Sequence, residues 1–158
     1  FDPDLGAPPP MRNNPDKAMP LTPPQPDMCN QPPSLTLLAA VRQFNAGDYF
    51  ICHETLEVLW LAEEGPVRNV YQGILQIGIG LLHLQRGNEP GARALLERGA
   101  QRLQPFLPVC LGLDLAALHG DTTKILAQLN APAREHPLQL VGTRPRITLI
   151  ETQNPGVP

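Results

Sequence analysis

The chain has 158 residues, of which 42% are hydrophobic and only 4% are aromatic, and its formal net charge at pH 7 is −3. This length accommodates one domain with a modest core, and an acidic balance without a basic cluster argues against nucleic-acid binding. The longest apolar run, Ile74 to Leu82, is interrupted by Gln76 and is too short to cross a bilayer. We therefore expect no transmembrane segment and no nucleic-acid partner.

The N-terminal part of the sequence is rich in proline. Eleven of the 20 prolines fall between Pro3 and Pro33, and each removes a backbone donor and fixes φ, which prevents a sustained helix or an interior strand. The composition predicts a Pro-rich extended arm over residues 1–33. The packed domain is expected over residues 34–130, and residues 131–158, which lack apolar periodicity, are expected to form an irregular C-terminal tail.

Apolar residues between positions 34 and 130 recur with a period close to 3.6, and no strand-like alternation appears. The pattern predicts four long helices, over about residues 35–46, 49–63, 66–86 and 89–103. Ser34, Asp48 and Asn88 are suited to cap helix N-termini, and Gly87 is suited to end the third helix. The run from Arg86 to Asn88 is therefore interpreted as a stop-and-cap junction rather than a ligand loop.

Pro105 and Pro108 interrupt the helical pattern, and two shorter helices are predicted from Asp114 to His119 and from Asp121 to Leu129. Short loops between five or six helices favour antiparallel neighbours. We therefore predict an all-α fold, a compact antiparallel helical bundle of five to six helices with extended N- and C-terminal arms. The segment from Arg146 to Ile150 has strand propensity, but the sequence shows no partner strand for it.

The third predicted helix contains Gly73, Gly78 and Gly80. Glycine is costly inside a helix, so these positions need a compensating purpose. The interpretation we favour is the close approach of a neighbouring helix.

Two consecutive predicted helices carry polar residues on or beside their apolar faces. The residues are His53, Glu54, Glu57 and Trp60 on the second helix and Gln72, Gln76, His83 and Arg86 on the third. In an antiparallel pair with a short turn, Glu57 would face Gln72 and His53 would face Gln76, and His83 would lie about two turns further along. We therefore predict a ligand-binding polar pocket between these helices, formed by these eight residues.

Three interpretations of these polar residues remain open. They form a structural hydrogen-bond network, a small-molecule or catalytic pocket in which His53 and Glu57 act as acid, base or anchor, or a metal site that adds His83. The metal interpretation is the weakest, because His83 would lie roughly 10 Å from His53 along the helix axis. We assign no metal ligands, no cofactor and no catalytic roles.

The three cysteines, Cys29, Cys52 and Cys110, are odd in number and lack the spacing of a metal site. Cys52 lies in a helical run and Cys110 in an apolar one, so both are interpreted as small core residues. We also see no charged, apolar and small-residue pattern of a secretion signal. Together these features predict a cytoplasmic protein.

The motif residues also match a known family. The segment from Phe44 to Trp60 reads FNxGxYFxxHExLExxW, and YQGILQ at residues 71–76 and HxxRGNxxGA from His83 follow it. This combination resembles the domain of unknown function 309 family, found in bacteria and archaea, over about residues 37–129. The resemblance implies a compact, all-helical, intracellular domain. Motif residues of the family correspond to His53, Glu54, Glu57, Trp60, Gln72, Gln76, His83, Arg86 and Asn88.

The resemblance implies no reaction and no catalytic roles, because no biochemical activity is established for the family. One departure from its pattern is Ile51-Cys52, where a more polar pair is expected. We predict an interaction module or accessory assembly subunit whose arms contact a protein partner or a second copy of the chain. The alternative is a small-molecule-binding protein or cryptic enzyme that uses the pocket of His53 and Glu57.

Overall fold

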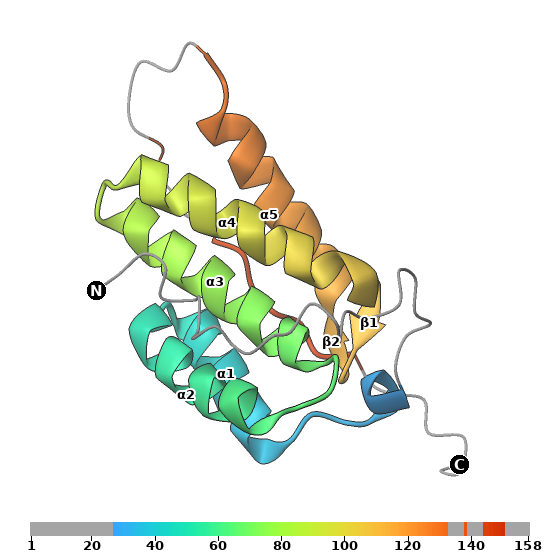
Figure 1. Cartoon of the computed structure of the whole chain (residues 1–158). Coiled ribbons are helices and arrows are strands. Elements are labelled where there is room, and N and C mark those ends of the chain that lie inside the picture. The colour runs from blue at the N-terminus through green and yellow to red at the C-terminus, as the bar shows by residue number, and fades with distance from the viewer. Residues whose placement is uncertain (1–26, 133–137, 139–143, 151–158) are drawn as a thin grey trace.

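The computed structural model describes residues 27–132, 138 and 144–150 of the chain. Within these residues the fold consists of five α-helices, two short 3₁₀ turns and a two-stranded antiparallel hairpin (Figure 1). The helices are α1 (Leu35–Ala46), α2 (Tyr49–Ala62), α3 (Arg68–Gln85), α4 (Glu89–Leu103) and α5 (Leu115–Leu129). The other elements are η3 (Asp27–Asn30), η4 (Gln104–Phe106), β1 (Val109–Cys110) and β2 (Leu113–Asp114). The predicted all-α bundle is confirmed.

The helices pack in chain order. α1 packs on α2, α2 on α3, α3 on α4 and α4 on α5 (Figure 1). Short loops join the first four helices, and such loops turn each helix back on its predecessor. α3 therefore occupies the centre, with α2 on one side and α4 on another.

Most helix boundaries fall where the sequence predicts caps. Ser34 Oγ accepts the amide of the third residue of α1 at 3.1 Å, and Gly47 ends that helix with a φ of 85°. Asn88 Oδ1 accepts the amide of the third residue of α4 at 3.0 Å. Asp48 stands before α2 as predicted, but its side chain makes no capping hydrogen bond.

α5 is one continuous helix, whereas the sequence predicted two short helices separated at Gly120. Asp114 Oδ1 caps α5 by accepting an amide of its first turn at 2.9 Å, and Asp121 lies inside the helix. A glycine inside a helix costs about 1 kcal/mol relative to alanine. Burial of Leu118 and Ile125 on the inner face of α5 offsets this cost, so the predicted break was wrong.

Glycines allow α3 and α4 to approach closely. A Cβ at Gly73 would lie 3.1 Å from Gly99 O, and one at Gly80 would lie 2.9 Å from a leucine side chain of α4. Gly99 faces α3 in return, where a Cβ would lie 2.7 Å from Gly73 O. Gly78 instead faces aromatic side chains at ordinary contact distances. The close approach predicted for the glycines of α3 therefore holds at Gly73 and Gly80.

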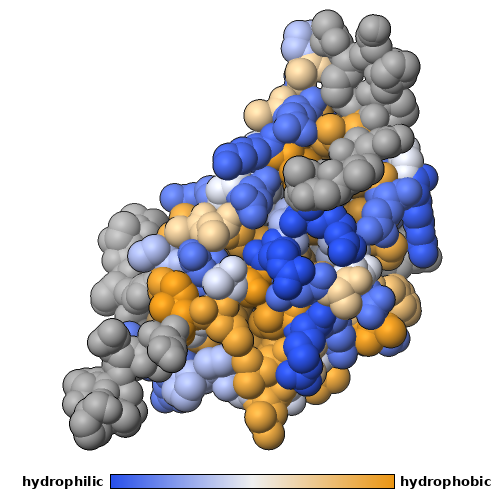
Figure 2. Space-filling view, turned by 180° about the vertical axis from the view of Figure 1, so that it is seen from behind, coloured by the Kyte–Doolittle hydropathy of each residue, from blue (hydrophilic) through white to orange (hydrophobic). Residues whose placement is uncertain are grey.

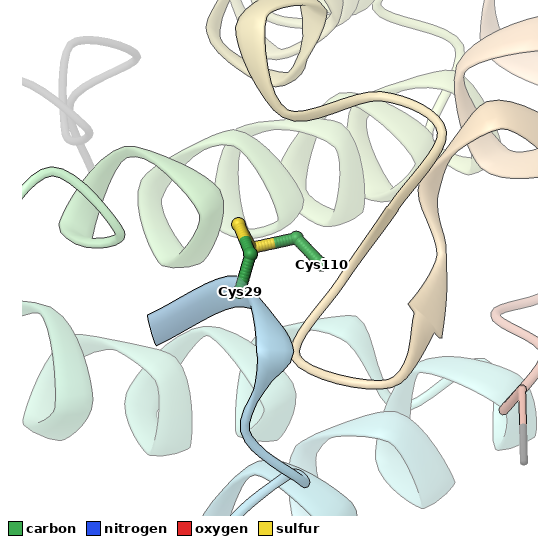
Figure 3. Close-up of a disulfide and its surroundings, with 2 residues drawn as sticks. All are labelled: Cys29 and Cys110. Atoms are coloured by element: carbon green, nitrogen blue, oxygen red, sulfur yellow. A yellow bond between two sulfur atoms is a disulfide. The ribbon is translucent and has the colours of Figure 1, made fainter. Parts of the chain in front are cut away.

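A disulfide attaches the N-terminal end of the described chain to the bundle. Cys29 of η3 is bonded to Cys110 of β1, 81 residues away in sequence, and both are buried (Figure 3). Cys110 is therefore not a free core residue as predicted, because the fold returns Cys29 to it, whereas Cys52 is a buried free thiol. Within the predicted arm of residues 1–33, the part around Cys29 is anchored, and residues 1–26 lie outside the described residues.

The C-terminal segment 144–150 also packs on the body. Asn45 Oδ1 accepts the amide of Ile147 at 2.8 Å, and Asn45 Nδ2 donates to Ile147 O at 3.0 Å. Ile147 is buried, and Leu149 forms an antiparallel bridge with Leu113 of β2. The strand propensity near residue 150 therefore has a partner, which the sequence did not indicate.

Both ends of the described chain converge at the turn of the β1–β2 hairpin. Gly112 occupies this turn with a φ of 74°, a conformation that favours glycine. A Cβ on Gly112 would lie 2.9 Å from Pro33 Cδ, and the amide of Ile150 donates to Gly112 O at 2.7 Å. Segments 27–33 and 144–150 therefore meet beside the hairpin.

Candidate functional site

The histidine of α2 lies at the boundary between the core and the outer face of the helix. His53 is 7% exposed, and its ring stacks on Phe50 with ring centroids 5.8 Å apart. Its Nδ1 atom is buried and has no hydrogen-bond partner within the described residues. Buried polar atoms without a partner are uncommon, so this nitrogen is a candidate binding atom.

The protonation of His53 depends on burial and on two carboxylates. Burial lowers the pKa of His53 below the ordinary value of 6.5, whereas Glu57 and Glu54 act in the opposite direction and have smaller effects. The ring is therefore neutral at neutral pH and can donate at one nitrogen and accept at the other. Glu57 is half-buried and Glu54 is exposed. The arrangement offers a ligand one neutral imidazole beside two carboxylates.

Gln76 bonds to α4 and not to His53. Its side chain is 2% exposed, and its Oε1 accepts from Arg102 Nε at 3.1 Å. A charged donor forms a stronger hydrogen bond than a neutral one, which explains why Arg102 is the partner of this amide. Gln72 is also buried. Within the described residues the structure shows no hydrogen bond between Gln76 and His53, and the pocket between α2 and α3 stays a prediction.

His83 and Arg86 belong to the junction between α3 and α4. Asn88 Nδ2 lies 3.4 Å from His83 Nδ1, and the Asn88 amide donates to His83 O at 2.8 Å. Gly87 has a φ of 82°, and Arg86 is exposed. Burial and the charge of Arg86 lower the pKa of His83. These contacts support the interpretation of residues 86–88 as a stop-and-cap junction.

The sequence pattern did not indicate that arginines gather at the start of α3. Arg68 Cζ lies 5.0 Å from the centroid of the buried Trp60 ring, and Arg102 Nη1 donates to Asn69 Oδ1 at 2.8 Å. Burial, followed by the charges of Arg68 and Arg98, lowers the pKa of Arg102. One sequence signal was present: α3 starts with a cation and has no acidic residue in its first turn, although positive charge is unfavourable there.

The outer face of α2 is apolar and acidic. Its exposed hydrophobic residues are Phe50 (48%), Ile51 (51%), Val58 (63%) and Leu61 (62%). At the helical period they fall within an arc of roughly 100° that also contains Glu54, and α2 contains no Lys or Arg. Seen from behind, hydrophobic side chains gather at the lower end of the molecule, where α1 and α2 lie (Figure 2).

Two features are absent from the described part of the chain. No three His, Cys, Asp or Glu side chains converge there so that they could hold a metal ion. None of the helices in the same residues has the length and apolar character needed to cross a membrane.

The fold and the motif residues define a small helical bundle whose second and third helices carry the polar positions. Residues 37–95 match the family model "Domain of unknown function (DUF309)". The resemblance predicted from the sequence is therefore confirmed for this segment, which is shorter than the predicted range of about residues 37–129. The segment contains most of α1, all of α2 and α3 and the start of α4, but neither disulfide cysteine and not Arg102.

A relative shows the same partial coverage. The chain is 38% identical over 58 residues to "Uncharacterized protein YpuF" of Bacillus subtilis (strain 168). The aligned segment covers 36% of this chain and 33% of that protein, so the chain matches about a third of the relative's length.

Proposed function

We propose that this protein is an interaction module that binds a partner protein through the outer face of α2. The proposal rests on the exposure of Phe50, Ile51, Val58 and Leu61 along one side of a single helix. Isolated exposed apolar residues are common on soluble proteins. Several of them on one side of a helix favour a docking surface instead.

The charge of α2 defines the chemistry of the partner. Glu54 lies among the exposed apolar residues, Glu57 lies beside them, and α2 contributes no basic residue. An amphipathic helix that combines apolar and Lys or Arg side chains would complement this face. A second copy docked through the same face would oppose Glu54 and Glu57 to like charges, which is unfavourable. We therefore infer that the occupant is a basic amphipathic helix of another protein.

The terminal segments contribute less to this proposal than the sequence suggested. Segment 144–150 packs on its own body through Ile147, so this part of the tail is already occupied. Contact of residues 1–26 with a partner stays a prediction, as does homo-oligomerisation through the arms.

The cytoplasmic location also stays a prediction. One of its premises was that the cysteines are unpaired, and the Cys29–Cys110 disulfide removes that premise. Disulfides persist mainly in oxidising compartments.

Site-specific photo-crosslinking in the host organism tests the docking surface. A photoreactive residue in place of Val58 or Leu61 should crosslink to one partner protein, whereas one in place of Leu35 or Lys124, both exposed elsewhere, should not. Leu61→Asn should abolish the crosslink from position 58, and the matched control Leu35→Asn should preserve it.

The identity of the crosslinked species decides between the occupants. The partner segment should be basic and apolar, and its binding to the purified protein should weaken as salt is raised. Crosslinks formed only between copies of this chain, or an absence of crosslinks from positions 58 and 61, would contradict the proposal.

A small-molecule site or enzyme that uses His53 and Glu57 is the second candidate function. The buried, unpartnered Nδ1 atom of His53 favours it. Mass spectrometry of small molecules that co-purify with the native protein and with His53→Gln discriminates the two functions. A molecule lost in His53→Gln, with the crosslink from position 58 retained, would favour this second function.

A further inference from the structure

We propose that Arg68 and Arg102 form a binding site for a phosphate group at the N-terminal end of α3. Arg102 reaches the site from α4, and Trp60 of α2 contacts Arg68. The outer face of α2 takes no part in it, and the site is therefore independent of the proposed docking function.

Arg102 is held in a fixed orientation by neutral partners. Its Nε donates to Gln76 Oε1 at 3.1 Å, and its Nη1 donates to Asn69 Oδ1 at 2.8 Å. These bonds use two of the five N–H donors of a guanidinium group. Both acceptors are uncharged amides, so they orient the guanidinium group without neutralising it and leave donors for an anion.

Arg68 is held by an aromatic ring. Its Cζ lies 5.0 Å from the centroid of Trp60, and Trp60 is only 5% exposed. Arg68 Nε is buried and has no hydrogen-bond partner within the described residues. In the preceding loop, Glu63 Oε2 accepts the amide of Gly65 at 2.9 Å. Arg68 is therefore positioned by Trp60 and carries a donor that no described residue satisfies.

The local electrostatics favour an anion at this place. Arg68 is the first residue of α3, at the positive end of the helix dipole, and the first turn of the helix has no acidic residue. Arg102 Nη1 donates to Asn69, the residue that follows Arg68, so Arg102 reaches the same end of α3 as Arg68 does. Arginine stays protonated at neutral pH, so the positive charge persists.

Phosphate fits this site better than a carboxylate does. A phosphate monoester carries about −1.5 to −2 charges at pH 7 and three strong acceptor oxygens, which balances two guanidinium groups. Arginine also binds phosphate through two parallel hydrogen bonds. Free phosphate and a monoester share this chemistry, so the proposal covers both.

Isothermal titration of the full chain with inorganic phosphate at constant ionic strength tests the site. We expect saturable binding with a dissociation constant of about 1 mM or tighter. A parallel titration with glycerol 3-phosphate distinguishes a site for the free ion from one for a monoester. An absence of saturable binding in both titrations would overturn the proposal.

Matched arginine variants distinguish the effect of losing the site from the effect of losing one positive charge. Arg68→Gln should weaken phosphate binding by roughly tenfold or more, and Arg102→Lys should do so as well because lysine lacks the planar fork. Arg42→Gln removes the same charge from the exposed surface of α1 and should leave binding unchanged. Arg68→Gln alone decides the question where Arg102→Lys does not fold. Equal weakening by Arg42→Gln would contradict the proposed site.

Discussion

His53 and His83 are buried imidazoles in different parts of the molecule, and the pKa of each lies below the ordinary value of 6.5, mainly because of burial. The unfolded chain therefore takes up protons at a higher pH than the folded chain does. The stability that this difference provides is fully present above pH 6.5 and is lost as pH falls toward the folded pKa values.

We predict that the free energy of unfolding decreases between about pH 7.5 and pH 5.5. His53→Gln should reduce this dependence because one of the two groups no longer titrates. Urea denaturation of the native protein and the variant at both pH values measures the effect. An equal pH dependence in native protein and His53→Gln would show that His53 does not contribute.

Single residues were predictable from the sequence where their partners are near in the chain. Ser34 and Asn88 cap their helices as predicted, because each bonds to an amide only three residues away. The bond between Gln76 and Arg102 spans 26 residues and depends on how α4 packs on α3. Periodicity identifies a polar residue on an apolar face, but it does not show which neighbouring helix supplies the partner.

At the scale of elements, the glycine contact between α3 and α4 leads to a prediction. Gly99→Ala should destabilise the fold by about 1–3 kcal/mol, the usual cost of overpacking, since its Cβ would lie 2.7 Å from Gly73 O. Gly120→Ala in α5 should instead stabilise it by about 0.5–1 kcal/mol, because nothing lies within 4 Å of that Cβ.

Urea denaturation of the two glycine variants beside the native protein measures both effects. Opposite signs are expected for the same chemical change. A neutral Gly99→Ala would mean that α4 shifts without cost, and the close approach would then not be important for stability.

Helices were the elements that the sequence specified best. Their apolar period and end signals located α1 to α4 correctly, because amphipathic patterns and caps act within one element. Gly120 is a residue type that often ends a helix, and Asp121 is one that often caps the next helix. α5 nevertheless continues through both. Tertiary burial outweighs local preference there, and a single sequence does not show which of the two prevails.

At the scale of the whole molecule, the Cys29–Cys110 disulfide is expected to be a main source of stability. The double variant Cys29→Ser with Cys110→Ser should lose about 2–4 kcal/mol of unfolding free energy, since the bond closes a loop of 81 residues. A reductant should lower the stability of the native protein and leave the double variant unchanged. Urea denaturation with and without reductant measures this, and equal stability of oxidised and reduced native protein would refute it.

Contacts between residues that are far apart in the sequence were not predictable. The disulfide joins cysteines that are 81 positions apart in the sequence. The hydrogen bonds between Asn45 and Ile147 join residues that are 102 positions apart. The pairing of three cysteines and the docking of a short apolar segment depend on the folded surface, which the sequence pattern does not encode locally. The His53 motif and the family were recognisable, whereas the arginines of the proposed phosphate site required the packed helices.

The convergence of segments 27–33 and 144–150 at Gly112 has an architectural consequence. Within the described residues, the chain enters and leaves the bundle beside the same turn. Such a domain can be inserted into, or suspended from, a larger polypeptide at a single point without breaking a helix.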